Sequence, residues 1–309
     1  YAFTGADNGT VSLTVTEAVA GVRTWTGAAG TSWHEEENWD PAAVPTGGDD
    51  VTVAASATLA VADLAAVRSL AVGAGASVAV TGEGPIQVGA GVDVSAGASL
   101  DWAVPLLGVG GTFEKRGAGQ LTVRGDQGAT MQNDWRLVGG RTVFTSGAAL
   151  GTDTTSAAAL TLSNNTFRYT GEAAEVRRPV TLLGELPCMF DIVGDLTFRD
   201  FRMAFAQGDA GLVKTGAGTL TLQVPSGTTT LSVWKASPRK GNVDVTGWFA
   251  PSAAGEVANW DGAGQFSVLD GCVEIVGAGK AASTVKQEHQ GSIGGSGWPS
   301  ATAPELRLR

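Results

Sequence analysis

The chain has few of the residues on which metal sites and many catalytic centres depend. Its 309 residues include two histidines, two cysteines and two tyrosines, and 16% are charged, where roughly 25% is usual for a soluble domain. No stretch of about 18 apolar residues occurs, so no segment is expected to cross a bilayer as a helix. A helical apolar period is also missing, which excludes a coiled coil or a helical bundle.

Glycine is abundant instead: there are 45 glycines, about twice the usual share. They have no strict period of three, so collagen is excluded. With 43% hydrophobic residues, the chain can form a core, and disorder driven by charge is not expected. The remainder is largely alanine, valine and threonine in short alternating runs, which predicts an all-β protein with many tight turns.

The net charge of −10 and the pI of about 4.7 argue against nucleic acid or an anionic membrane surface as a partner, because both are polyanions. Residues 1–5 have neither the basic nor the apolar region of a signal peptide. Residues 304–309 have the pattern of an interrupted strand. We therefore expect the chain to be one segment of a longer protein.

Strands are predicted where apolar residues fall at every second position, because one face of such a strand points inward. Gly-rich or Asn-rich breaks separate them, and no helical segment is long enough for a βαβ crossover. Two all-β architectures remain, a sandwich or barrel and a stack of coils. The clearest alternating runs are 11–15, 51–53, 77–80, 121–123 and 220–222.

Internal repetition favours the stack of coils. Residues 115–123 (KRGAGQLTV) recur as residues 214–222 (KTGAGTLTL), and a looser copy lies at 261–268. In each, a Gly-Ala-Gly turn leads into an alternating strand, and glycine suits a turn with positive φ or a close backbone approach. We expect coils of roughly 20–30 residues that stabilise one another by stacking.

These phrases resemble a known family. Residues 214–222 resemble the strand repeat associated with bacterial autotransporter passenger domains, and residues 139–151 resemble its continuation. Residues 24–53 are similar to the Trp-rich segment that often precedes such repeats in large surface proteins. The resemblance implies a right-handed parallel β-helix on a secreted or outer-surface bacterial protein, and it implies no reaction.

The predicted fold is thus an all-β, right-handed parallel β-helix with a Trp-rich N-terminal cap. Exposed strand edges at the end of a coil stack invite aggregation and need covering. We assign residues 1–50 to this cap and residues 51–309 to the coils. Residues 281–300 are interpreted as a loop or protrusion.

Two acidic patterns are candidate catalytic sites. Gly48-Asp49-Asp50 resembles the paired aspartates of β-helical pectin hydrolases, but the other motifs of those enzymes do not occur, so an acidic turn is preferred. Asp191, Asp195 and Asp200 form the densest carboxylate run, with arginines among them. A lyase site is one interpretation of that run, and a solvated strand face with cross-strand ion pairs is the other.

Metal and nucleophile sites find little support in the sequence. His34 and His289 lie far apart, and two cysteines and two histidines at these spacings do not make a four-ligand site. We predict no metal and no cofactor. Cys188 and Cys272 are either a disulfide or two free thiols.

Tryptophan is the most suggestive residue type, with nine in the chain. Indole faces can stack on sugar rings, so Trp33 and Trp39 are candidate glycan contacts. Alternatively, they close the end of the coil stack by burying a large apolar area.

Together these patterns predict a stalk or adhesin-like segment that presents loops to glycans or to surface proteins, without inserting in a membrane. The competing hypotheses are a β-helical polysaccharide lyase or hydrolase and a carbohydrate-binding module without catalysis.

Overall fold

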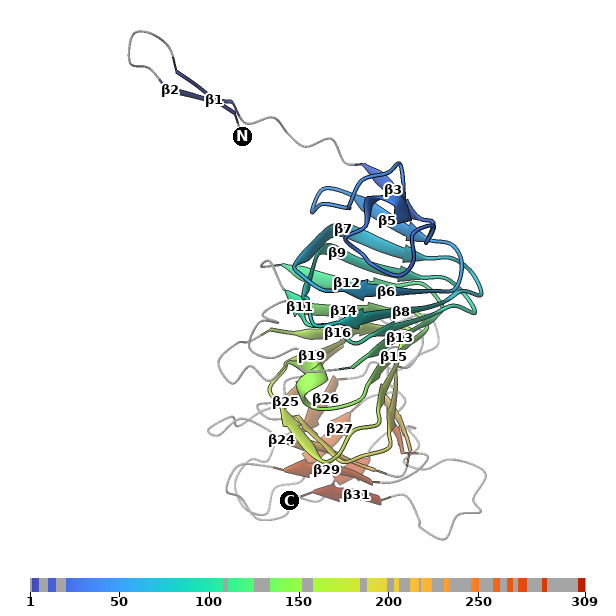
Figure 1. Ribbon diagram of the computed structural model, residues 1–309. Helices are drawn as coiled ribbons and strands as arrows, with labels where there is room; N and C mark the ends of the chain where they lie inside the picture. Colours follow the sequence, from blue (N-terminus) through green and yellow to red (C-terminus); the bar gives the residue numbers. More distant parts are fainter. Residues whose placement is uncertain are drawn as a thin grey trace, which may run out of the picture.

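The computed structural model describes residues 2–5, 11–14, 21–107, 111–124, 134–151, 158–183, 188–198, 203–205, 212–216 and 218–223, and seven short strands beyond them. The described chain is a stack of coils built from parallel strands, which confirms the predicted parallel β-helix (Figure 1). Two short 3₁₀ helices, η1 (Glu36–Asn38) and η3 (Ala148–Leu150), accompany the strands.

Sheet 1 forms one long side of the stack. Its end strand β4 (Trp39–Asp40) is antiparallel to its neighbour, and β11 (Leu106–Leu107) extends β9. The parallel strands are β3 (Val22–Trp25), β5 (Asp50–Val53), β7 (Ala65–Val72), β9 (Ile86–Val94), β12 (Thr112–Arg116), β14 (Asp134–Val138), β16 (Leu160–Ser163), β19 (Val180–Leu183) and β22 (Met203–Phe205).

Sheet 2 forms a second side of the stack, and from β5 onward the chain enters it after each parallel strand of sheet 1. All its pairings are parallel, and each coil adds about 20–25 residues over most of its length, as predicted. Its strands are β6 (Ala57–Val61), β8 (Ser77–Gly82), β10 (Ser99–Trp102), β13 (Gln120–Val123), β15 (Arg141–Phe144), β17 (Thr166–Tyr169), β20 (Cys188–Ile192), β23 (Leu212–Thr215) and β28 (Phe266–Val268).

Sheet 3 is a third parallel sheet that begins only after β17. Its strands are β18 (Ala174–Val176), β21 (Leu196–Phe198), β24 (Thr219–Gln223), β29 (Cys272–Val276) and β31 (Glu305–Leu308). Two small sheets complete the described strands: the antiparallel hairpin β1 (Ala2–Gly5) and β2 (Val11–Thr14), and a mixed sheet of β25 (Leu231–Val233), β26 (Thr246–Phe249), β27 (Ala258–Asp261) and β30 (Val285–Gln287).

Alternation along each strand places every second side chain in the interior, where it meets its counterpart in the next coil. One such column runs along sheet 1, and its members are all buried. In register order it contains Val51, Leu70, Val92, Lys115, Leu137 and Leu162. Lys115 thus takes a place that valine or leucine takes in the neighbouring coils.

The interior changes from aliphatic to aromatic along the stack. The coils of β5 to β9 bury mainly valine, leucine and alanine. From β12 onward, aromatic rings contact one another within and between coils, edge to face or tilted, with centroids 4.8–5.4 Å apart. These rings belong to Phe113, Trp135, Phe144, Phe167 and Phe190.

Tryptophans close the N-terminal end, as predicted. Trp33 is 0% exposed and Trp39 is 2% exposed, and their rings meet edge to face at 4.9 Å. Trp39 Nε1 donates to the Trp33 carbonyl at 2.8 Å, and Trp25 packs on the other edge of Trp39. This cluster covers the apolar interior at the first coil.

The two repeat copies occupy different corners of the coil. Gly117 and Gly119 turn the chain from β12 of sheet 1 into β13 of sheet 2, whereas Gly216 and Gly218 turn it from β23 of sheet 2 into β24 of sheet 3. Gly117 and Gly216 have φ of 84° and 82°, so the same left-handed turn is reused at both corners.

The division into residues 1–50 and 51–309 stays a prediction. Within the proposed cap, β3 already pairs in parallel with β5. The predicted protrusion at 281–300 lies, apart from β30, outside the described residues.

Candidate functional site

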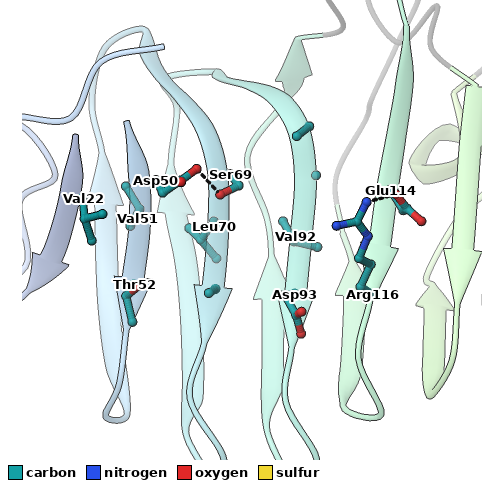
Figure 2. A pocket seen from close by; sticks show the side chains of 13 residues that line it. Val22, Asp50, Val51, Thr52, Ser69, Leu70, Val92, Asp93, Glu114 and Arg116 are labelled. Carbon is teal, nitrogen blue, oxygen red and sulfur yellow. Dashed lines mark hydrogen bonds and ion pairs between the residues drawn. The ribbon is translucent and has the colours of Figure 1, made fainter. Parts of the chain in front are cut away.

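An elongated hollow crosses the outer face of sheet 1. It has a volume of about 420 Å³ and runs over β5, β7, β9 and β12, with β3 at one end (Figure 2). We call it the sheet 1 groove. It is lined by Val22, Asp50, Val51, Thr52, Ser69, Leu70, Ala71, Ala90, Gly91, Val92, Asp93, Glu114 and Arg116.

Gly91 is one of the residues that line the groove. In the outward column of sheet 1 it stands between Ser69 of β7 and Glu114 of β12. A Cβ at this position would lie 1.9 Å from the Glu114 carbonyl oxygen, and φ is +140°, so only glycine fits there. Gly91 is buried, and the absence of its side chain lets the backbones of β9 and β12 approach closely.

Asp50 fixes one rim of the groove. Its carboxylate accepts hydrogen bonds from Arg68 Nε at 2.8 Å and from Ser69 Oγ at 2.6 Å. The bonds from Arg68 hold the pKa of Asp50 below its ordinary value, with help from Ser69. Asp50 is therefore an ionised acceptor with a fixed orientation near neutral pH.

Glu114 and Arg116 form the opposite rim. The Glu114 carboxylate contacts the guanidinium of Arg116 on its own strand and lies 3.6 Å from Arg136 Nε in the next coil. Asp93, which is exposed, stands beside Arg116 in the register. The rim thus presents carboxylates and guanidiniums side by side.

Asp49 and Asp50 do not act as a pair, which agrees with the preferred interpretation as an acidic turn. Asp49 is buried and accepts from Gly21 N at 3.1 Å, Thr46 N at 2.8 Å and Thr46 Oγ1 at 2.9 Å. Burial opposes ionisation, but these bonds and the charge of Arg23 outweigh it and lower the pKa of Asp49. Asp49 ties the cap to the first coil, whereas Asp50 faces the groove.

The acidic run near residue 191 is spread over separate elements. Asp191 lies on β20 and pairs with Arg168 of β17 at 2.9 Å, which matches the predicted cross-strand ion pair. Asp195 is exposed in the turn before β21, and its backbone oxygen accepts from Ala174 N at 3.1 Å. Asp200 lies outside the described residues.

Trp33 and Trp39 were the other candidate contacts. Because both indoles are buried in the cap, neither offers a face to a sugar in this structure, and the capping alternative accounts for them. His34 contacts the backbone of Asp63 through Nε2 at 3.2 Å.

The described residues hold neither a metal-ligand cluster nor a membrane-spanning helix. Within them, no group of three or more His, Cys, Asp or Glu side chains could hold a metal. No helix in that part of the chain is long and apolar enough to span a membrane. Cys188 is a buried free thiol whose pKa is raised by burial; the side chain of Cys272 lies outside the described part.

Sequence reasoning missed the groove entirely. Asp93, Glu114 and Arg116 are alternating outward residues, which the sequence does show. Their alignment in one groove depends on the register between β7, β9 and β12, and that register is set by coil lengths rather than by a local motif.

Residues 24–139 match the family described as a domain of unknown function (DUF8693). This stretch begins within β3, ends just after β14 and includes all the groove residues except Val22. No curated protein and no solved structure matches the chain. The description of the matched family names no activity.

Proposed function

We propose that this chain is a rigid stalk segment of a secreted or cell-surface bacterial protein, with outer faces that contact glycans or other proteins. The observation that carries the proposal is the continuous register of sheets 1 and 2 from β5 to β20 around an apolar core. The resemblance of residues 214–222 to autotransporter-associated repeats supports the location.

Rigidity follows from the way the coils are held. Each coil hydrogen-bonds to the coils on both sides and shares its interior columns with them, so bending would break contacts in several coils at once. Neighbouring strands are about 4.8 Å apart. A stack of this kind extends a protein along one axis while its sides remain free for contacts.

Ion pairs between coils add to the outer faces. Asp50 pairs with Arg68, Asp101 with Arg124, and Asp191 with Arg168, each across neighbouring coils. Exposed pairs of this kind contribute little to stability, roughly 0–1 kcal/mol each. They do leave a polar surface suited to water and to hydroxyl-rich partners.

Deleting one complete coil tests the stalk proposal. Removing residues 137–161 joins Arg136 to Leu162, which takes the register position of Leu137. We expect a folded protein whose maximum dimension in small-angle X-ray scattering is about 5 Å shorter than wild type. A compact, near-spherical wild-type scattering profile would contradict the stalk.

Surface location is tested separately on cells that produce the full-length parent protein. An antibody raised against this chain should label intact cells, or detect the protein in the medium. Labelling that requires cell lysis would contradict the location.

A carbohydrate-binding module is the second candidate function, and the sheet 1 groove is the observation that favours it. A stalk and a binding surface are compatible, because the groove lies on the side of the stack.

A further inference from the structure

We propose that the sheet 1 groove is a binding site for an uncharged, extended glycan, which lies across β5, β7, β9 and β12 over Gly91. The proposal deepens the proposed function, because it names the surface and the ligand class that a stalk of this kind would present. It rests on the shape of the groove, its charge balance and the fixed positions of its polar groups.

The shape admits a flat ring. Gly91 has no side chain, and Ala71 and Ala90 carry only methyl groups, so small residues make up part of the lining. The polar groups of the lining stand beside them on all four strands: Asp50, Thr52, Ser69, Asp93, Glu114 and Arg116 (Figure 2). Sugar rings likewise combine apolar faces with a hydroxyl-bearing edge.

Charge balance argues for an uncharged ligand. Each groove carboxylate has a guanidinium beside it: Arg68 beside Asp50, Arg116 beside Asp93, and Arg116 and Arg136 beside Glu114. A polyanion would meet three carboxylates and only one lining guanidinium, Arg116, and a polycation would have to displace the arginines that already pair with those carboxylates. Hydroxyl groups can both donate to the carboxylates and accept from the arginines.

The polar groups are also held in place before any ligand arrives. Asp50 is fixed by Arg68 and Ser69, and Glu114 is fixed by two arginines. Groups that are already ordered lose less conformational entropy on binding. Neighbouring strands are roughly 5 Å apart, close to the length of one pyranose in an extended chain, so successive sugars would meet successive coils.

The test is isothermal titration of the purified chain with cellohexaose, mannohexaose and chitohexaose, and with polygalacturonate as the anionic comparison. Ala71→Phe fills the groove without removing a polar group. Ala79→Phe is the matched control, because Ala79 is also a half-buried, outward alanine, but on β8 of sheet 2. Urea unfolding of both variants verifies that each is folded.

We expect at least one neutral oligosaccharide to bind the wild type, Ala71→Phe to weaken that binding tenfold or more, and Ala79→Phe to leave it within twofold. Asp93→Asn should weaken it severalfold. The proposal is overturned if none of the neutral probes binds, if polygalacturonate binds more tightly than all of them, or if both phenylalanine variants bind like the wild type. None of these results affects the scattering test, so the stalk and the groove can fail independently.

Discussion

Lys115 of β12 donates from Nζ to the carbonyl oxygen of Gly139, 2.8 Å away in the next coil. The same ammonium donates to Gly117 O at 2.6 Å and to Gly119 O at 2.8 Å. An ammonium has three N–H donors, so each donor has a carbonyl acceptor in the turns that follow β12 and β14. Lys115 is 0% exposed and fills a place in the apolar column of sheet 1. It therefore links the Gly-Ala-Gly turn of one coil to the Gly-Gly turn of the next.

Replacing Lys115 should destabilise the protein. Lys115→Met keeps much of the side-chain volume but removes the ammonium donor from three carbonyls, of which the Gly119 carbonyl bond is buried, and we expect a loss of about 1–3 kcal/mol in the free energy of unfolding. Arg124→Met removes an exposed cation directly after β13 and should cost less than about 1 kcal/mol. Urea unfolding at pH 7 measures both. Equal or greater stability of Lys115→Met would contradict the role of the ammonium.

Lys115 should also make stability depend on pH in the alkaline range. Burial lowers the pKa of Lys115 from its ordinary 10.5 to about 8, and the charge of Asp93 opposes this only in part. Between pH 8 and 10.5 the unfolded chain therefore binds more protons at this residue than the folded chain does. Stability rises with pH under that condition, so the wild type should gain stability relative to Lys115→Met from pH 8 to 10.

The measurement is urea unfolding of the wild type and Lys115→Met at half-unit steps from pH 7.5 to 10. Other groups that titrate in this range act on both proteins, and the difference isolates Lys115. A difference that stays constant or shrinks with rising pH would show that Lys115 keeps an unshifted or raised pKa.

Gly91→Ala should be severely destabilising. The added Cβ would lie 1.9 Å from the Glu114 carbonyl oxygen, and the backbone would have to keep φ at +140°. We expect a loss of more than about 3 kcal/mol, at the upper end of single substitutions. Gly75→Ala is the control: φ is +72°, but nothing lies within 4 Å of its Cβ, so backbone strain alone should cost roughly 1–2 kcal/mol. Similar melting temperatures for the two variants would argue against the close approach.

Asp49 and Asp50 should differ in their contribution to the cap. Asp49→Ala removes three hydrogen bonds that join Thr46 and Gly21, and we expect a loss of about 1–3 kcal/mol. Asp50→Ala removes a partly exposed ion pair and should cost less than about 1 kcal/mol. Because the pKa of Asp49 is lowered in the fold, its contribution is present above its ordinary pKa of 3.8 and is lost as pH falls through the lower value.

Thermal unfolding followed by tryptophan fluorescence reports on this region, since Trp25, Trp33 and Trp39 lie in the cap. A larger loss for Asp50→Ala than for Asp49→Ala would contradict the assignment of their roles.

The sequence was most informative where local pattern decides structure. Alternation located β5 at Val51, β8 at Val78 and β13 at Leu121, because an inward side chain at every second position is a property of one strand. The Trp-rich cap was also readable, since large indoles near an end of the stack have few other places to be buried.

Contacts between neighbouring coils could not be predicted from the sequence. Lys115 lies two residues after Phe113 on the same strand, so the alternation places both side chains in the interior. No local sequence pattern predicts that the carbonyl oxygens of Gly117, Gly119 and Gly139 accept hydrogen bonds from its ammonium. Nor does the repeat reveal that its two copies turn different corners. The sequence also does not show whether an indole is exposed or buried, which is why Trp33 and Trp39 are candidate glycan contacts at the level of sequence.

The change of core from aliphatic to aromatic gives the rod a direction. A coil from the region of Val51 and Leu70, moved next to Phe144 and Phe167, would leave empty space, and the reverse exchange would force rings into a channel too small for them. If such a protein lengthens by duplication of a coil, the new coil can therefore pack only beside coils whose interior side chains have a similar size. The interior side chains of each coil are thus specific to its position along the axis.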